Sequence, residues 1–131
     1  MTHQYQILIV GGGNAGISVA ARLLRKNSKL DIAIIEPSER HYYQPAWTLV
    51  GGGTFDIRNT IRNESSVIPP NAKWIKDAVV TFQPGQNTVT TKQGDVYKYK
   101  YLIVAPGIKL DWDKVKGLKE TIGKNNVTSN Y

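Results

Sequence analysis

The stretch ILIVGGGNAGISVAARLLRKN, residues 7–27, decides the fold of this chain. It opens with an uncharged apolar run that ends in glycine, and this composition predicts a buried strand over residues 6–11. The amphipathic run that follows predicts a helix over residues 14–27, with basic residues near the end where cations suit the helix dipole. One face of that helix holds Ile17, Ala20, Ala21 and Leu24. A second apolar run at residues 30–35 completes a β-α-β unit, which implies parallel strands in a sheet covered by helices.

Three glycines in this stretch, Gly11, Gly13 and Gly16, satisfy the pattern G-x-G-x-x-G. In a dinucleotide site the first glycine permits the tight turn, the second lets a pyrophosphate approach, and the third lets helix and strand pack closely. The phosphates then lie at the unpaired amides that open the helix, here around Asn14 and Ala15. Glycine turns are common, so the pattern alone is not specific. The strand before it and the helix after it favour a dinucleotide site.

Glu36 ends the second predicted strand and follows Gly16 at the spacing of a ribose-binding acid. A carboxylate at this point accepts hydrogen bonds from the ribose hydroxyls of a bound adenosine. A solvated glutamate at a strand end is the alternative, and it would be the better interpretation of this residue in isolation. The negative charge would repel a 2′-phosphate, which disfavours NADP and leaves both NAD and FAD open.

The rest of the chain departs from alternating strands and helices. Residues 38–53, SERHYYQPAWTLVGGG, predict a loop with a short helical turn, and residues 56–63 predict a short helix. The run YLIVAPG at residues 101–107 predicts one more buried strand, and the chain after Asp111 reads as loop. Runs of period two, separated by turn residues, predict a β-meander at residues 78–83, 88–93 and 95–99.

Composition limits the classes of protein that remain. The chain has 131 residues, a formal charge of +7 and no cysteine, which leaves no disulfide, thiolate metal site or thiol nucleophile. No window approaches the ~20 apolar residues of a membrane span. Between Lys92 and Lys124 acids are interleaved with the lysines and no arginine cluster forms, so we interpret the basic residues as a solvated face and not as a nucleic-acid site. A weak attraction to acidic membrane surfaces or to anionic cofactors stays open. The leader MTHQYQ is too short for a targeting peptide, and we expect a cytoplasmic protein.

The run YKYKYLIVAPG, residues 97–107, resembles the second flavin-binding motif of the FAD-dependent pyridine nucleotide–disulfide oxidoreductase superfamily. In that motif an apolar strand ends in Ala-Thr-Gly. Here Pro106 stands between Ala105 and Gly107, which removes an amide donor and a hydroxyl from the turn. The segment IIEPSERHYYQPAWTLVGGG is similar to the corresponding part of sulfide:quinone oxidoreductases, and WIKDAVVTFQP, YKYLIVAPGIKLDW and KVKGLKE follow in the same order.

The resemblance implies an α/β fold: a Rossmann-like FAD-binding domain of the three-layer ββα type, of which residues 1–131 are the N-terminal portion. It implies FAD as the cofactor, with Asn14 and Ala15 at the pyrophosphate and Glu36 at the ribose. It also implies Gln44 in the loop that lines the cofactor and Val79 at the adenine through its backbone. Without the resemblance, Gln44 reads as a polar loop residue and Val79 as a core residue of a strand. The expected cofactor-binding residues are Gly11, Gly13, Asn14, Ala15, Gly16, Glu36, Gln44, Val79, Ala105 and Gly107.

The resemblance further implies an enzyme that oxidises sulfide and passes electrons through FAD to a membrane quinone. The family's sulfur chemistry needs redox-active cysteines, which this chain lacks, so we assign no catalytic residue and expect the segment alone to be inactive. His41 has no second histidine or acid at ligand spacing, so it reads as structural and we assign no metal. Peripheral association with a membrane, at its cytoplasmic face, would come from regions outside this chain, and a homo-oligomer stays open.

Two other functions stay open. Within the same superfamily the alternative is another flavoenzyme, such as a type II NADH:quinone oxidoreductase, and cysteines in the remaining sequence would separate the two. From a different class, the alternative is a free-standing nucleotide-binding module that senses a cofactor without turnover. Whether the reading frame ends after Tyr131 would decide that case.

Overall fold

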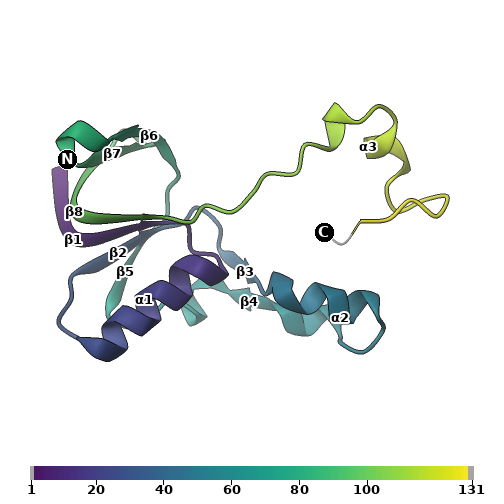
Figure 1. The fold of residues 1–131 in the computed structure, drawn as a ribbon, viewed down its shortest axis with the longest axis horizontal. Helices are drawn as coiled ribbons and strands as arrows, with labels where there is room; N and C mark the ends of the chain where they lie inside the picture. Colours follow the sequence, from purple (N-terminus) through teal and green to yellow (C-terminus); the bar gives the residue numbers. More distant parts are fainter. Residues whose placement is uncertain (1, 130–131) are drawn as a thin grey trace.

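The computed structural model describes residues 2–129, and a six-stranded mixed sheet forms its centre (Figure 1). The strands lie in the order β5-β2-β1-β8-β7-β6. The first part of the sheet is parallel and consists of β5 (Ala72–Ile75), β2 (Ile32–Ile35), β1 (Thr2–Val10) and β8 (Val96–Val104). β7 (Thr88–Thr91) pairs antiparallel with β8, and β6 (Val79–Gln83) pairs antiparallel with β7. The predicted α/β class with a parallel sheet and a β-meander is confirmed.

Helix α1 (Asn14–Lys26) covers one face of the sheet, as its amphipathic sequence predicts. Its residues Ala20 and Leu24 pack against Ile9 and Ile34 in a cluster that fills the space between helix and sheet. Fully burying an isoleucine such as Ile9 stabilises the fold by roughly 1.5–3 kcal/mol. This packing fixes the N-terminus of α1 next to the carboxyl ends of β1 and β2.

The opposite face of the sheet carries a second core, because successive residues of a strand point to opposite sides. Leu8 and Ala33 belong to this core, together with Val89 of β7 and Tyr97 of β8. The meander β6-β7-β8 thus lies on the side away from α1 (Figure 1). Its turn between β6 and β7 contains a 3-10 turn, η4 (Pro84–Gln86), and Asn87 with φ = 53°.

A small antiparallel pair, β3 (Arg40–Tyr42) and β4 (Ile61–Asn63), stands beside the main sheet. Between the two strands lie the helical segments η1 (Gln44–Ala46), α2 (Trp47–Gly51) and η2 (Ile57–Thr60), and η3 (Glu64–Ser66) follows β4. The predicted helical turn within residues 38–53 is confirmed, but strand β3 in the same stretch was not predicted. The prediction of a helix over residues 56–63 is wrong beyond Thr60, because Ile61–Asn63 extends to pair with β3.

Two further details correct the sequence analysis. β5 was not predicted, and it forms the edge of the sheet by pairing with β2. The runs at 95–99 and 101–107 form one continuous strand, β8, instead of two. β1 pairs with β8 along its whole length while β7 pairs only with the first part, so one strand serves both the parallel and the antiparallel half.

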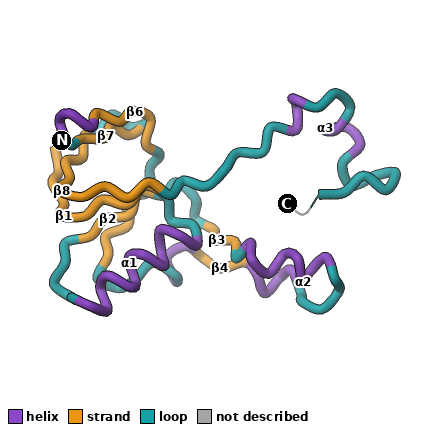
Figure 2. The backbone as a smooth tube through the Cα atoms, in the orientation of Figure 1, coloured by secondary structure: helices purple, strands orange, loops and turns teal. Residues whose placement is uncertain are grey.

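The chain after β8 leaves the sheet as an extended segment (Figure 2). The loop predicted beyond Asp111 contains a 3-10 turn, η5 (Trp112–Lys114), and one turn of helix, α3 (Leu118–Thr121). The last two residues of that predicted loop, 130 and 131, lie outside the described residues. Across residues 2–129, no helix is long and apolar enough to cross a membrane.

Candidate functional site

Close contact with neighbouring backbone requires glycine at two positions of the turn between β1 and α1. Gly11 has φ = +103°, and a Cβ on it would overlap the carbonyl oxygen of Ala105. A Cβ on Gly16 would overlap the carbonyl oxygen of Gly11, because the first turn of α1 lies directly against the end of β1. The Gly11 amide donates to the Ile35 carbonyl at 2.9 Å, and the Ala105 amide donates to the Val10 carbonyl at 2.7 Å. The structure therefore brings Gly11, Gly16 and Ala105 together.

Gly13 stands where the turn opens to solvent. A Cβ on Gly13 would meet no atom within 4 Å, so the protein itself does not demand glycine there. Gly13 is the N-cap of α1, no side chain caps this helix end, and its first turn contains no acid. The open amides and the helix dipole at Asn14 and Ala15 suit an anionic group. The turn therefore fits the pyrophosphate of a dinucleotide.

Glu36 lies at the end of β2 and faces the glycine turn. Its Oε2 accepts a hydrogen bond from the Gly12 amide at 2.8 Å, and its Oε1 accepts one from the Ser38 amide at 2.8 Å. The indole of Trp74 donates to the Glu36 carbonyl at 2.9 Å, which fixes the backbone as well. Each carboxylate oxygen keeps further acceptor capacity, so the side chain is held in place and can still accept from a ligand hydroxyl.

Two pockets meet at Glu36. The first is lined by Gly12, Gly13, Glu36, Ser38, Arg40, His41, Tyr42, Gln44 and Glu64. The second is lined by Val10, Gly11, Ile35, Glu36, Pro37, Ala78, Val79 and Pro106. The first lies at the open helix start and contains the predicted residue Gln44, and the second contains the predicted residue Val79. Gly107 has φ = +75° and is not among the residues that line either pocket.

A buried acid and a buried histidine line the first pocket. His41 is 8% exposed and Glu64 is 1% exposed. The His41 Nε2 lies 3.0 Å from the Asn14 Oδ1, and its Nδ1 lies 3.5 Å from the Glu64 Oε2. The Glu64 Oε1 is buried and has no hydrogen-bond partner among the described residues. This row of side chains joins the floor of the pocket to the first residue of α1.

The electrostatics of the pocket follow from this burial. Loss of solvent, and secondarily the nearby charge of Glu36, raises the pKa of Glu64 to about 7. Glu64 is therefore substantially protonated at neutral pH. Among residues 2–129, no group of three or more His, Cys, Asp or Glu side chains is arranged to hold a metal ion.

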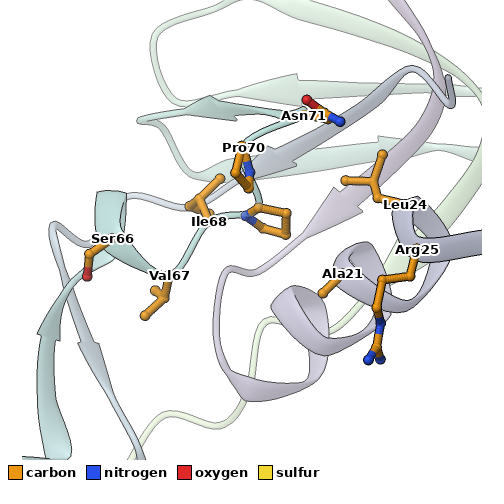
Figure 3. A pocket seen from close by; sticks show the side chains of 9 residues that line it. Ala21, Leu24, Arg25, Ser66, Val67, Ile68, Pro70 and Asn71 are labelled. Carbon is orange, nitrogen blue, oxygen red and sulfur yellow. The ribbon is translucent and has the colours of Figure 1, made fainter. Parts of the chain in front are cut away.

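A third hollow lies between α1 and the segment that leads into β5 (Figure 3). Its lining is mainly apolar, with Leu24, Ile68 and Pro70 facing it and Arg25 as the charged residue at its edge. The lining includes no acid, histidine or other group suited to catalysis. This hollow therefore offers no catalytic group, in contrast to the two pockets at the glycine turn.

Comparison with known proteins agrees with this geometry. Residues 5–130 match the family model described as pyridine nucleotide-disulphide oxidoreductase. The chain belongs to this family. The mitochondrial sulfide:quinone oxidoreductase of Dictyostelium discoideum is 55% identical over 127 residues, which cover 96% of this chain and 28% of that protein. The enzyme of the same name from Mus musculus is 44% identical and is matched over 98% of this chain and 29% of its own length. The chain thus spans less than a third of these relatives.

Two solved structures of oxidoreductases give the same result for the fold. The sulfide:quinone oxidoreductase from Aquifex aeolicus superposes with a TM-score of 0.67 at 26% identity, over 83% of this chain and 25% of that one. NADH:rubredoxin oxidoreductase from Clostridium acetobutylicum superposes with a TM-score of 0.59 at 29% identity, over 83% of this chain and 30% of that one. The predicted resemblance to the pyridine nucleotide–disulfide oxidoreductases is confirmed.

Membership of the pyridine nucleotide-disulphide oxidoreductase family, together with this fold, implies a flavin or nucleotide cofactor. The residues present suit such a group, since Gly13 leaves space at the open start of α1 and Glu36 is fixed beside it. Sequence reasoning missed Glu64, and it treated His41 as a structural residue without a partner. Glu64 lies in the polar run IRNESS, where nothing in the pattern indicates burial. Only the pairing of β3 with β4 brings Glu64 to His41.

Proposed function

We propose that this chain is the FAD-binding segment of a flavoprotein that oxidises sulfide and passes the electrons to a membrane quinone. The observation that carries the proposal is the high identity, across nearly the whole chain, to a protein named sulfide:quinone oxidoreductase. The geometry of the glycine turn supports it independently, because an open helix start beside a fixed acid suits a dinucleotide. We infer that residues 1–131 form the N-terminal part of the FAD-binding domain of a longer enzyme.

In this proposal each residue of the turn has a distinct task. The amides of Asn14 and Ala15 bind the pyrophosphate, and the space beside Gly13 admits it. Glu36 accepts hydrogen bonds from the ribose hydroxyls, and Val79 lines the pocket for the adenine. Gln44 lines the pocket at the helix start.

The remaining predicted residues shape the site. Gly11 and Gly16 bring β1, α1 and Ala105 into close contact, and Gly107, with φ = +75°, directly follows Pro106, which lines the second pocket. Bound FAD supplies a carrier that accepts an electron pair from one substrate and delivers it to another. The residues of this chain would hold and orient the adenosine diphosphate half of that carrier.

The sulfur chemistry of the whole enzyme would then lie outside these residues. Sulfide oxidation of this kind needs a thiol, and the sequence contains no cysteine. We therefore assign binding to this segment and the attack on sulfur to the remainder of the protein. The quinone substrate would bring the whole enzyme to a membrane surface, which we propose is the cytoplasmic face, and association of identical subunits is compatible with this arrangement.

A flavoenzyme that oxidises NADH is the second candidate, and the 29% identity to NADH:rubredoxin oxidoreductase is the observation in its favour. The identity to the mitochondrial sulfide:quinone oxidoreductases is higher and covers more of the chain. A nucleotide-binding module without turnover would share the same turn geometry. The proposed function is therefore tested by activity as well as by binding.

The experiment uses the full-length protein that carries this segment. We expect it to purify with the visible absorbance of bound flavin and to reduce a soluble quinone when sulfide is added. NADH is the control reductant. Reduction by NADH and not by sulfide would favour the second candidate, flavin without turnover would favour the binding module, and a folded protein without flavin would reject the FAD assignment.

A further inference from the structure

Three polar side chains form a row that reaches from the interior to the start of α1. Glu64 follows β4, His41 lies in β3, and Asn14 is the first residue of α1. His41 lies between the other two, with one ring nitrogen 3.0 Å from the Asn14 Oδ1 and the other 3.5 Å from the Glu64 Oε2. The proposed ligand contacts of Asn14 do not explain why a buried acid and a buried histidine stand behind it.

The chemistry of each group fixes the direction of the hydrogen bonds. With the Asn14 amide turned so that its Oδ1 faces the ring, that oxygen can only accept, and the His41 Nε2 then carries a hydrogen and donates it. In the neutral ring the Nδ1 then presents a lone pair to Glu64, which a carboxylate would repel and a protonated carboxyl group would not. The row thus holds one proton between the Nδ1 and the Oε2. With its oxygen occupied, Asn14 keeps its NH₂ group for a ligand at the start of α1.

The surroundings of Glu64 favour the proton on the carboxyl group. Gly12 of the glycine turn lies against its Oε1, which has no hydrogen-bond partner among the described residues. The charged and titratable groups around the same pocket are Glu36 at the end of β2 and Arg40, His41 and Tyr42 of β3. Burial, followed by the charge of Glu36, raises the pKa of Glu64 to about 7.

We propose that Glu64 and His41 are positioning residues, which turn the NH₂ group of Asn14, and not its oxygen, toward the anionic part of the bound dinucleotide. The inference rests on the proposed function, because it takes a pyrophosphate as the group that Asn14 meets. It assigns a task to Glu64 and His41, which act on the ligand through the Asn14 side chain. An amide donor at the start of a helix binds an anion, and an amide oxygen at the same place repels it.

Loss of the proton from Glu64 reverses the direction of both hydrogen bonds that His41 makes. Once Glu64 is a carboxylate, the favourable tautomer of His41 has its hydrogen on Nδ1, facing Glu64. The Nε2 then becomes an acceptor, so the Asn14 carboxamide must rotate and donate its NH₂ group to the ring. The oxygen of Asn14 is left at the start of α1. Affinity for an anionic ligand should therefore fall as the pH rises above the pKa of Glu64.

The first measurement needs no dinucleotide. Nitrogen NMR of the His41 ring, in the folded chain, distinguishes the two tautomers directly. We expect the hydrogen on Nε2 at about pH 6 and on Nδ1 at about pH 8.5, with a change centred near pH 7. In Glu64→Gln the side-chain NH₂ donates to Nδ1 at every pH, so the hydrogen should stay on Nε2 throughout. A tautomer that does not change with pH in the unsubstituted chain overturns the proposal.

The second measurement is binding of ADP and of FAD by titration calorimetry over the same pH range. The affinity of the unsubstituted chain should fall about tenfold per pH unit above pH 7, as one linked proton requires. Glu64→Gln should bind about tenfold or more tightly than the unsubstituted chain at about pH 8.5, with no such dependence. Glu39→Gln is the matched control, because Glu39 is an exposed neighbouring acid paired with Lys76, and its variant should keep the dependence.

The outcomes separate this proposal from the function on which it rests. A tautomer change at His41 without binding of either ligand would count against the dinucleotide site and support the hydrogen-bond row. Binding that is independent of pH, or a Glu39→Gln variant that loses the dependence as Glu64→Gln does, would overturn the positioning role and leave the FAD assignment standing.

Discussion

The carboxylate of Glu36 accepts a hydrogen bond from the amide of Gly12 at 2.8 Å, so the end of β2 is tied to the turn that opens α1. The same side chain lines both pockets of the candidate site. Its second oxygen is held by the Ser38 amide. The acid is therefore held in a fixed orientation beside the start of α1, which would lower the ordering cost of binding a ligand there.

Replacing Glu36 should weaken FAD binding. In the full-length protein, Glu36→Ala is expected to cost about 1.5–3 kcal/mol of binding free energy, the range of hydrogen bonds to a charged group. Retention of flavin on dilution measures the loss. Glu39→Ala is the control, since this exposed acid pairs with Lys76 at the surface and should leave retention unchanged. Equal retention in both variants would remove Glu36 from the site.

Gly13 and Gly11 should respond differently to a side chain. Gly13→Val places its methyl groups in open space, so the chain should fold and lose the dinucleotide. Gly11→Ala meets the Ala105 carbonyl at a positive φ, and strain of this kind costs about 1–3 kcal/mol, so this variant should lose stability. Urea unfolding and flavin content, measured on both, separate the two effects. A flavin-loaded Gly13→Val protein would mean that the second glycine is not at the pyrophosphate.

Glu64 makes stability depend on pH. Its pKa in the folded chain, about 7, is raised above the ordinary value of 4.5, so its contribution is fully present below pH 4.5 and is lost as the pH rises to about 7. The loss amounts to ~3 kcal/mol in free energy of unfolding over that window. Urea unfolding at several pH values measures it. Glu64→Gln should remove this slope, and an unchanged slope in that variant would assign it to other groups.

The 131-residue chain should not oxidise sulfide, even with excess FAD. It has no thiol to attack sulfur, and no other side chain substitutes for one. Sulfide and a soluble quinone are added to the purified chain, and the rate of quinone reduction is compared with that of free FAD. A rate clearly above free FAD would mean that catalytic groups lie within these residues.

The sequence predicts the parts of this fold that local patterns define. The strand, glycine turn and helix from Ile7 to Lys26 follow from an apolar run, three glycines and an amphipathic period, and all three are local properties. The meander was equally predictable, because apolar and polar residues alternate along its strands and polar turns separate them. The open helix start and Glu36 were predicted as neighbours for the same reason, since a β-α-β unit brings the ends of its strands together.

The elements that the sequence analysis missed depend on pairing between strands that are far apart in the sequence. β4 consists of Ile61, Arg62 and Asn63, which show no alternation of their own and become a strand because β3 lies beside them. β5 is recognisable only once β2 is present as its partner. Glu64 becomes a buried acid only because this pairing carries it under the glycine turn, so a polar stretch of sequence gave no sign of it.

The pairing of β1 with β8 also sets the order in which this protein can assemble. Val10 pairs with Val104, and the glycine that opens the turn lies against Ala105, so one wall of the site comes from a segment that is distant in the sequence. During synthesis β1 and the glycine turn leave the ribosome before β8, which arrives only after β6 and β7 have been made. Contacts so distant in sequence form slowly, since the loop between them must close first. A nascent chain would therefore expose an unpaired edge of the apolar strand β1 until β8 reaches it, and we expect aggregation or a requirement for chaperones during this interval.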